Sequence, residues 1–437
     1  MRLMLILYFA GALICCAHSA GDSVPRLLLV SFDGFRADYL ETYKLPHLQE
    51  FIEDGVLVRE VTNSFITKTF PNHYTIVTGL YEESHGIVAN DMYDADAKKV
   101  FSQFNDSDPF WWDEAVPIWV TNQQQGKGAS AAAMWPGSDV KINNTTPHFF
   151  MKYNFSVKFE ERAERIVSWL NSSEPVVNFA VLYWEEPDAS GHKYGPNDTQ
   201  NMGRVLEEVD KHVGFLMNKL KAAGLWDTVN VIITSDHGMA SCSAEKLIVL
   251  DKCLGRNNYT LIDRTPVAAV LPRQNKEVVY NLLKNCSSHM KVYLKEEIPD
   301  RFHYRHHRRI QPIILVADEG WTIVQNESLS KSTDSLWSGN LLVNFGMKNG
   351  KGNTGNVKRR KRLMGGRTMG EGQYGKRLVG FGEERRSSGF LLWLIQQLLL
   401  CCALTFGYKA CFGAGGWGGE RCPRGRGGGS DTVLTFG

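Results

Sequence analysis

Three continuous apolar runs, each followed at once by polar side chains, constrain the fold of this 437-residue chain more than any other feature. They cover Arg26 to Phe32, Val176 to Tyr183 and Val229 to Thr234. Such runs are typical of strands buried on both faces of a parallel sheet. Helical patterns lie between them, from Phe159 to Leu170 and from Met202 to Leu220. The alternation predicts an α/β domain with a doubly wound, mostly parallel sheet and helices on both faces.

The residues after these runs have the chemistry of metal ligands. Carboxylate and imidazole groups follow each run in turn: Asp33, then Asp188 with His192, then Asp236 with His237. Open α/β sheets bind their ligands at the carboxyl ends of the strands. Carboxylate and imidazole groups together suit zinc. A single residue of this kind is more often a helix cap or a structural loop residue, so the predicted metal site depends on their convergence.

A hydroxyl group lies in a fourth stretch, Phe65-Ile66-Thr67-Lys68-Thr69-Phe70-Pro71-Asn72-His73-Tyr74. The first half of this stretch is apolar and Thr-rich and predicts a strand. Pro71 cannot continue a strand ladder but can begin a helix, so Thr69 is predicted to lie at a strand-to-helix turn. A hydroxyl is a weak nucleophile until a base or a metal ion lowers its pKa. We therefore predict that Thr69 is the catalytic nucleophile beside the metal site.

These motifs resemble those of the ectonucleotide pyrophosphatase/phosphodiesterases, a branch of the alkaline-phosphatase-like metalloenzymes. The resemblance is dense from about Val24 to Lys331. It implies an alkaline-phosphatase-like fold and hydrolysis of nucleotide pyrophosphate and phosphodiester bonds through a nucleotidyl-threonine intermediate. The implied substrates are small-molecule nucleotides, in particular diadenosine polyphosphates. The triphosphate would give AMP and ADP, and the tetraphosphate would give AMP and ATP.

The resemblance also implies two zinc ions about 4 Å apart. The ligands of the first zinc would be Asp33, Thr69, Asp236 and His237. The second would be held by Asp188, by His192 and by a third histidine from a later motif.

Four residues are implied in substrate binding: Phe70, Asn90, Tyr153 and Asp188. The amide of Asn90 would donate to a phosphoryl oxygen as charge develops there. The rings of Phe70 and Tyr153 would stack on the base, although both rings could instead pack in the core. The role of Lys68 stays open between a phosphate contact and a surface loop.

Several other histidines and arginines invite a role as metal ligands or phosphate clamps. They are His73, His85 and the basic run from Arg301 to Arg309. We expect a solvated basic loop instead, because a run of like charges is most often a solvated surface.

The first twenty residues predict a signal peptide, with Arg2, an apolar run from Leu3 to Ala17 and small residues at Ser19 and Ala20. A short membrane anchor is the alternative. Either one directs the chain into the secretory pathway and to the cell surface or the medium. Asn-X-Ser/Thr acceptors for glycosylation occur at Asn105, Asn143, Asn144, Asn154, Asn171, Asn197, Asn258, Asn285 and Asn326.

The body of the chain contains three cysteines, Cys242, Cys253 and Cys286. An odd number in an oxidising compartment predicts one disulfide and one remaining thiol. The resemblance pairs Cys253 with Cys286, which leaves Cys242 as a buried free thiol. The net charge of +2 says little, because the basic excess comes largely from the last hundred or so residues. The body shows no interleaved basic and aromatic patch, so we expect no binding of nucleic acid.

The sequence departs from the family pattern after Lys331. Residues 21–331 are predicted to form the catalytic domain, incomplete at its C-terminal end, and residues 332–437 a low-complexity, disordered tail. No histidine follows His307, so the third ligand of the second zinc is missing and we expect impaired activity. The family's membrane anchor is not recognisable, and the apolar block from Phe390 to Phe406 is at the short edge of a span.

Two alternatives to an active nucleotide phosphodiesterase stay open. The chain could be an inactive or misfolded isoform, or it could hydrolyse lipid or choline-phosphate esters. Phe70 and Tyr153 favour nucleotides over lipids, because aromatic rings stack on bases.

Overall fold

The computed structural model describes residues 25–59, 61–104, 106–126 and 128–326. The chain divides into two compact units, residues 1–393 and 394–437, and every described residue belongs to the first. The predicted signal peptide, the tail, the block from Phe390 to Phe406 and the acceptor Asn105 lie outside the described residues. Within this part of the chain, no helix has both the length and the apolarity needed to cross a bilayer.

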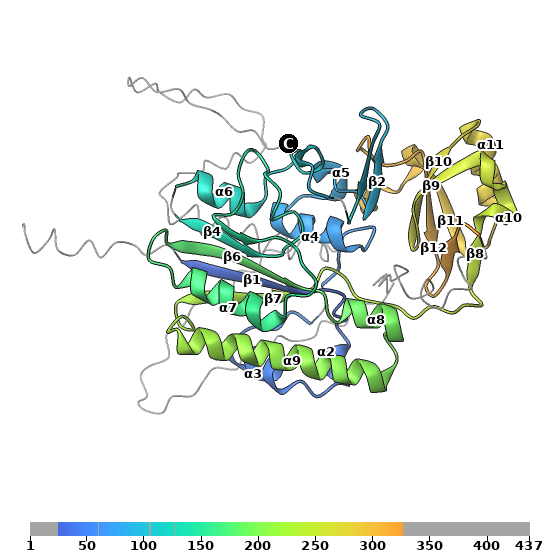
Figure 1. The fold of residues 1–437 in the computed structure, drawn as a ribbon. Coiled ribbons are helices and arrows are strands. Elements are labelled where there is room, and N and C mark those ends of the chain that lie inside the picture. Colours follow the sequence, from blue (N-terminus) through green and yellow to red (C-terminus); the bar gives the residue numbers. More distant parts are fainter. Residues whose placement is uncertain (1–24, 60, 105, 127, 327–437) are drawn as a thin grey trace, which may run out of the picture. The chain divides into compact units, whose positions relative to one another are not determined.

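A parallel five-stranded sheet carries the predicted site. Its strands lie in the order β5 (Phe149–Met151), β4 (Ala129–Ala133), β6 (Val177–Trp184), β1 (Arg26–Phe32) and β7 (Val229–Thr234). The three apolar runs are therefore neighbours in space, and their carboxyl ends meet at one edge of the sheet (Figure 1). This topology confirms the predicted fold class.

Helices cover both faces of this sheet because successive side chains of β1 point to opposite faces. Leu28 and Val30 pack with α3 (Pro46–Asp54), α7 (Phe159–Leu170) and α9 (Thr199–Ala222). Leu29 packs on the other face, where α4 (Thr69–Thr78) and α6 (Ile118–Gln124) lie (Figure 1). The bounds of α7 agree with the prediction, because its apolar residues recur at helical spacing.

The sequence pattern also favours strands from Ile118 to Val120 and near Gly55 to Asn63, and these two predictions are wrong, as is the strand predicted before Thr69. The segment from Ile118 to Val120 is the first turn of α6, because a short apolar run does not distinguish a buried helix from a strand. The segment from Gly55 to Asn63 contains no strand among its described residues. The residues before Thr69 form a turn in which Ile66 (φ 80°) and Thr67 (φ 26°) have left-handed backbone angles.

A second sheet, which is antiparallel, is formed by strands between Tyr259 and Ala317. Its order is β11 (Met290–Leu294), β12 (Ile313–Ala317), β10 (Val267–Pro272) and β9 (Tyr259–Asp263). Beside it lie α10 (Leu250–Leu254) and α11 (Lys276–Lys284). The remaining helices and strands are α2 (Tyr39–Thr42), α5 (Glu82–His85), α8 (Asp188–Tyr194), β2 (Asp91–Asp94), β3 (Lys99–Ser102), β8 (Leu247–Val249) and β13 (Thr322–Val324).

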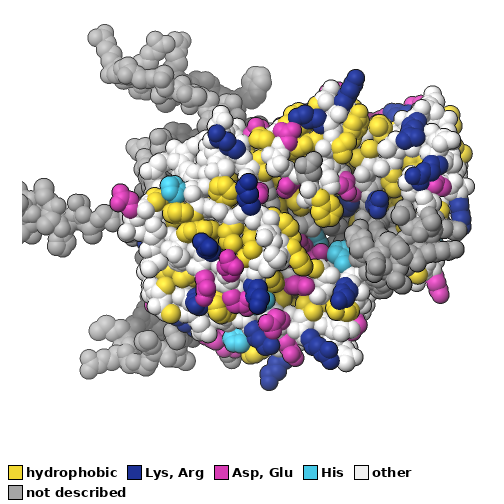
Figure 2. Space-filling model, viewed as in Figure 1, with side chains coloured by type: hydrophobic (Ala, Val, Ile, Leu, Met, Phe, Trp, Pro, Cys, Tyr) yellow, Lys and Arg dark blue, Asp and Glu magenta, His cyan; other side chains and the backbone are white. Residues whose placement is uncertain are grey.

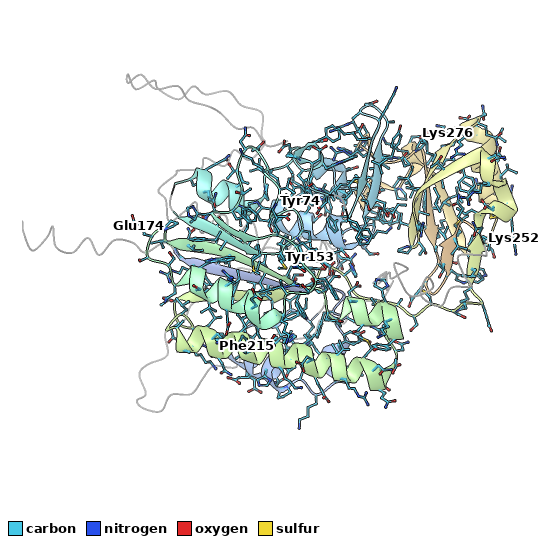
Figure 3. All side chains as sticks on the ribbon, viewed as in Figure 1. Tyr74, Tyr153, Glu174, Phe215, Lys252 and Lys276 are labelled. Atoms are coloured by element: carbon cyan, nitrogen blue, oxygen red, sulfur yellow. A yellow bond between two sulfur atoms is a disulfide. The ribbon has the colours of Figure 1, made fainter. Side chains whose placement is uncertain are left out.

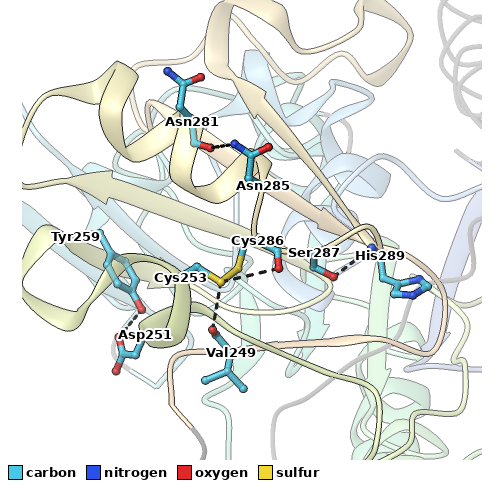
Figure 4. Close-up of a disulfide and its surroundings, with 9 residues drawn as sticks. All are labelled: Val249, Asp251, Cys253, Tyr259, Asn281, Asn285, Cys286, Ser287 and His289. Carbon is cyan, nitrogen blue, oxygen red and sulfur yellow. Dashed lines mark hydrogen bonds between the residues drawn. A yellow bond between two sulfur atoms is a disulfide. The ribbon is translucent and has the colours of Figure 1, made fainter.

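A disulfide links Cys253 of α10 to Cys286, just after α11, as the resemblance implies (Figure 4). The two Cα atoms are 5.5 Å apart. Cys242 is a half-buried free thiol, and burial raises its pKa to about 11. A thiol of this kind stays protonated and unreactive at neutral pH.

The basic run from Arg301 to Arg309 is only partly the solvated loop that we predicted. Its exposed basic residues are Arg301, His303, His306 and Arg308, whereas His307 and Arg309 are buried, which corrects the prediction for those two. The Arg309 side chain is fully buried, donates to the carbonyls of Gly86 (2.7 Å) and Trp111 (2.9 Å), and pairs with Asp94 and Glu114. Such burial is stable because each donor of the guanidinium can find an acceptor. Arg309 thereby holds the segment before β12 against the part of the chain between Gly86 and Glu114.

Opposite charges are interspersed on the face drawn in Figure 2. Ion pairs made by helix α9 include Lys219 with Glu164 (2.6 Å) and Lys221 with Glu50 (2.9 Å). Six glycosylation acceptors are exposed, and two, Asn258 and Asn326, are half-buried. The exposed acceptors are Asn143, Asn144, Asn154, Asn171, Asn197 and Asn285.

Candidate active site

Thr69 is the first residue of α4, at the end of a tightly held turn. The preceding Lys68 is buried rather than on a surface loop, and its ammonium contacts the Asp263 carboxylate of β9 at 2.5 Å. It also donates to the carbonyl of Arg264 (3.0 Å). The turn that presents the hydroxyl is thus anchored to the antiparallel sheet.

Asp33 and Asp236 each have one oxygen anchored and one oxygen without a hydrogen-bond partner in the described part of the chain. Oδ2 of Asp33 accepts from the Tyr183 hydroxyl (2.7 Å), and Oδ1 of Asp236 accepts from the Gly34 amide (3.2 Å). The other oxygens, Asp33 Oδ1 and Asp236 Oδ2, are buried without a hydrogen bond to any described residue, and Asp236 Oδ2 also lies 3.4 Å from Nδ1 of His73. Both oxygens lie within 3.4 Å of the same atom, Nε2 of His237.

The tautomer of His237 follows from its neighbours. Its Nδ1 lies 2.8 Å from the carbonyl of Gly238, which only accepts hydrogen bonds, so Nδ1 carries the proton. Nε2 lies within 3.4 Å of these two carboxylate oxygens and 3.4 Å from Thr69 Oγ1, and in the neutral ring it carries the lone pair that a metal ion needs. This is the arrangement of a metal-ligating imidazole that is oriented through its other nitrogen.

Asp188 and His192 lie one helical turn apart on α8, with Asp188 Oδ2 3.2 Å from His192 Nε2. Asp188 Oδ1 is another buried oxygen without a hydrogen-bond partner among the described residues. Ligand atoms of Asp33, Asp188 and His237 lie within 4.8 Å of one another. Gly34 (φ +68°) makes this approach possible, because a Cβ at that position would lie 2.8 Å from Cβ of Asp188.

Two residues that the sequence analysis did not assign complete the site. His73 is fully buried, and its Nδ1 donates to the Thr69 carbonyl (2.8 Å) while its Nε2 contacts the Ser31 hydroxyl (2.9 Å). It therefore orients the nucleophile's own backbone rather than lying in a solvated loop. Its spacing of four residues from Thr69, on one helix, was the signal that could have identified it. Tyr183, which anchors Asp33, carried no such signal.

The predicted substrate residues surround the same edge of the sheet. Oδ1 of Asn90 accepts from the Phe70 amide (3.0 Å), which leaves its NH₂ group to donate elsewhere. The Phe70 ring is half-buried against Phe101 and Trp112. Tyr153 is 54% exposed and lies near the carboxyl ends of the strands, so it is not a core residue (Figure 3).

The donor set fits a divalent cation. Burial raises the pKa of Asp33 well above its ordinary value, and the neighbouring carboxylates of Asp236 and Asp188 raise it further. Carboxylates that repel one another in a buried site are stabilised in their charged form by an opposite charge. These carboxylate oxygens and His237 Nε2 are also the ligand atoms that zinc prefers.

Comparison with known proteins identifies the family. A family model, type I phosphodiesterase / nucleotide pyrophosphatase, matches residues 27–341. The chain belongs to this family. The match continues past Lys331, where we placed the end of the resemblance. As a member of the type I phosphodiesterase / nucleotide pyrophosphatase family, the protein is a metal-dependent hydrolase that acts on a small-molecule nucleotide.

Individual relatives agree with this assignment. The chain is 64% identical to the bis(5'-adenosyl)-triphosphatases ENPP4 of Bos taurus and Homo sapiens over 342 residues, which cover 78% of this chain and 76% of each relative. A solved structure of human ectonucleotide pyrophosphatase/phosphodiesterase 5 matches with a TM-score of 0.68 and 54% identity, over 69% of this chain and 81% of the other. An inactive threonine-to-alanine variant of the murine protein, in complex with AMP, matches with the same TM-score and 51% identity, over 70% of this chain and 81% of the other.

Proposed function

We propose that this chain hydrolyses nucleotide phosphoanhydride bonds with zinc as its metal and Thr69 as its nucleophile. The observation that supports this most strongly is the pair of buried carboxylate oxygens, on Asp33 and Asp236, that face His237 Nε2 beside the Thr69 hydroxyl. Diadenosine polyphosphates are the proposed substrates. The activity in the name of the ENPP4 relatives supports this class.

Each residue has a defined task in this proposal. When bound, zinc would lower the pKa of the Thr69 hydroxyl and stabilise negative charge on the phosphoryl group. Thr69 Oγ1 forms a bond to phosphorus while the bond to the leaving nucleotide breaks, and water then hydrolyses the nucleotidyl-threonine ester to release AMP. Asn90 donates its NH₂ to a phosphoryl oxygen. Phe70 and the exposed Tyr153 hold the base between them.

The two predicted metal sites differ in the ligands that the described residues offer. The first has Asp33, Asp236 and His237 with Thr69, whereas the second has Asp188 and His192. Three protein ligands are usual for a catalytic zinc. We therefore propose that the first site binds zinc tightly and that the second binds it weakly, which lowers activity at limiting zinc.

The test is zinc stoichiometry and product analysis on one sample of the purified protein. The proposal predicts that one zinc per chain resists dialysis, and that diadenosine triphosphate gives AMP and ADP at a rate that rises when zinc is added back. Asp33→Asn should remove the tight zinc, whereas Asp188→Asn should leave it bound. Release of phosphocholine from a choline phosphodiester, without AMP release from the dinucleotide, would refute the proposed substrate class.

We further propose that the chain enters the secretory pathway. The predicted signal peptide, the exposed glycosylation acceptors and the Cys253–Cys286 disulfide support this location. Glycosidase treatment of the secreted protein should lower its apparent mass. Accumulation of an unglycosylated, reduced protein in the cytosol would contradict the proposal.

A further inference from the structure

A buried chain of hydrogen bonds lies behind the turn that presents Thr69. It begins at Glu82 of α5, passes through Ser64, and ends at Asn72 of α4. Glu82 is fully buried and contacts the Ser64 hydroxyl through Oε1. The Ser64 hydroxyl also lies 2.9 Å from Oδ1 of Asn72. None of these three residues has a role in the proposed chemistry.

Asn72 holds both ends of the turn. Its Nδ2 donates to the Lys68 carbonyl (3.1 Å), and its Oδ1 accepts from the Ser64 amide (2.9 Å). Ser64 precedes Ile66 and Thr67, which have left-handed backbone angles, and Lys68 immediately precedes Thr69. β-Branched residues seldom adopt such angles, so the turn needs support from its surroundings.

The direction of each hydrogen bond fixes the protonation of Glu82. The Lys68 carbonyl only accepts, so Nδ2 of Asn72 faces it and Oδ1 faces Ser64. Oδ1 also only accepts, so the single hydroxyl proton of Ser64 is donated to Asn72. The contact between Ser64 Oγ and Glu82 Oε1 then needs a proton from Glu82.

We propose that Glu82 is a carboxylic acid that stays protonated around neutral pH, and that its O–H, donated through Ser64 to Asn72, positions the Thr69 nucleophile. Glu82 is thus a positioning residue, and this role rests on the proposed function of Thr69. Burial supports the proposal, because it raises the pKa of Glu82 to about 8 against the opposing effect of the Ser64 hydrogen bond. Oε2 is buried without a hydrogen-bond partner among the described residues, which would be costly for an ionised group.

Other charged groups near Glu82 do not account for a change between pH 7 and pH 9. Tyr304 faces Glu82, and burial raises its pKa above this range. Nε2 of His85 lies 2.9 Å from the Thr75 hydroxyl, and burial lowers the pKa of His85 to about 3. Glu83 is the other neighbour, and its Oε2 accepts from the amides of Arg305 and His306.

The test compares kcat for nucleotide hydrolysis of the wild type and Glu82→Gln from pH 7 to pH 9. A glutamine NH₂ donates to Ser64 as the neutral acid does, but it does not ionise. The ratio of kcat of the wild type to that of Glu82→Gln should fall about tenfold from pH 7 to pH 9 with a midpoint near pH 8, since a group with a pKa of about 8 is half ionised at pH 8 and about nine-tenths ionised at pH 9. Effects of pH on the metal and the substrate cancel in this ratio. A flat ratio would overturn the proposal.

Further variants separate positioning from general stability. Ser64→Ala removes only the relaying hydroxyl and should lower kcat about tenfold or more with KM nearly unchanged, because a displaced nucleophile costs turnover rather than binding. Glu82→Leu should do the same. Glu83→Gln, the matched control, should resemble the wild type. An unchanged kcat in Ser64→Ala would overturn the proposal.

The pH dependence of thermal unfolding tests Glu82 independently of Thr69. The folded pKa of about 8 lies above the ordinary 4.5, so this group contributes stability that is fully present below about pH 4.5 and is lost as pH rises toward 8. Glu82→Gln should lose this decline. If Thr69→Ala stays active but this stability difference is seen, the assignment of the nucleophile fails and that of the neutral acid survives. The absence of the difference would overturn the neutral acid.

Discussion

At the scale of single residues, the site is organised by pairs in which one group fixes another. Lys68 and Asp263 illustrate this, because both side chains are almost fully buried and each is the charge partner of the other. Burial raises the pKa of Asp263, against the opposing effect of the Lys68 ammonium. The pair connects the residue before the nucleophile to strand β9, so its loss affects both stability and catalysis.

Lys68→Met should destabilise the protein by about 3 to 5 kcal/mol, because it leaves the Asp263 carboxylate buried without its partner. The double variant Lys68→Met with Asp263→Leu should recover much of this loss. Urea unfolding of the two variants and the wild type measures both effects. A double variant less stable than the single one would show that the pair is not coupled in this way.

Substitution of Gly34 tests whether the close approach of the end of β1 to Asp188 is needed for metal binding. Gly34→Ala forces its new Cβ against Asp188, as well as incurring the cost of a left-handed backbone angle. Gly224 (φ +67°) has no neighbouring atom within 4 Å of a Cβ, so Gly224→Ala incurs the backbone cost alone, about 1 kcal/mol. Only Gly34→Ala should lower zinc affinity as measured by competition with a chelator. Equal zinc affinities in the two variants would contradict the close approach.

At the scale of elements, helix α4 and the parallel strands create the site, and the antiparallel sheet supports it. Val267, Ala269 and Ile314 of that sheet belong to the same apolar cluster as Tyr74 and Val77 of α4. The disulfide lies at the far side of this sheet from that cluster, between α10 and the end of α11. We therefore expect the disulfide to stabilise the sheet without taking part in catalysis.

Reduction of the disulfide, or Cys253→Ser with Cys286→Ser, should lower the free energy of unfolding by about 2 to 5 kcal/mol, because the bond closes a loop with a sequence separation of 33 residues. At a temperature where the variant stays folded, kcat should change less than twofold. Calorimetry and a turnover assay on the same samples measure the two quantities. A large loss of kcat without loss of stability would contradict the supporting role.

At the scale of the whole molecule, metal binding and folding are linked. The carboxylates of Asp33, Asp188 and Asp236 come from separate strand ends, so the repulsion between them opposes folding in the absence of a cation. A bound cation removes this cost and adds its own binding energy to stability.

Removal of zinc by a chelator should lower the melting temperature, since a ligand at 100 times its Kd stabilises by about 2.7 kcal/mol. The melting temperature of Asp33→Asn should respond little to zinc, because that variant lacks a ligand of the tight site. The measurement is a thermal scan of both proteins with and without zinc. Identical responses would place the stabilising metal elsewhere.

Much of the site could be predicted from the sequence because it depends on local pattern. The buried apolar runs identified β1, β6 and β7, and their carboxyl ends brought Asp33, Asp188 and Asp236 together. The errors arose where tertiary contacts decide. The turn before Thr69 is held by Asp263, which is distant in the sequence, and by Asn72, which no sequence motif marks as a supporting residue. The burial of Arg309 depends on acceptors on β2, on residues 110 and 111 and on Glu114, so its charge alone suggested exposure.

The proposed role of Thr69, to carry the nucleotide during turnover, can be tested by trapping the covalent intermediate. Zinc-loaded protein is mixed with diadenosine triphosphate, quenched in acid within milliseconds, and digested for mass spectrometry, with Thr69→Ala treated in parallel. We expect AMP attached to the peptide that contains Thr69, and a loss of AMP release of at least about 10³-fold in the variant. Undiminished AMP release by Thr69→Ala would contradict this role.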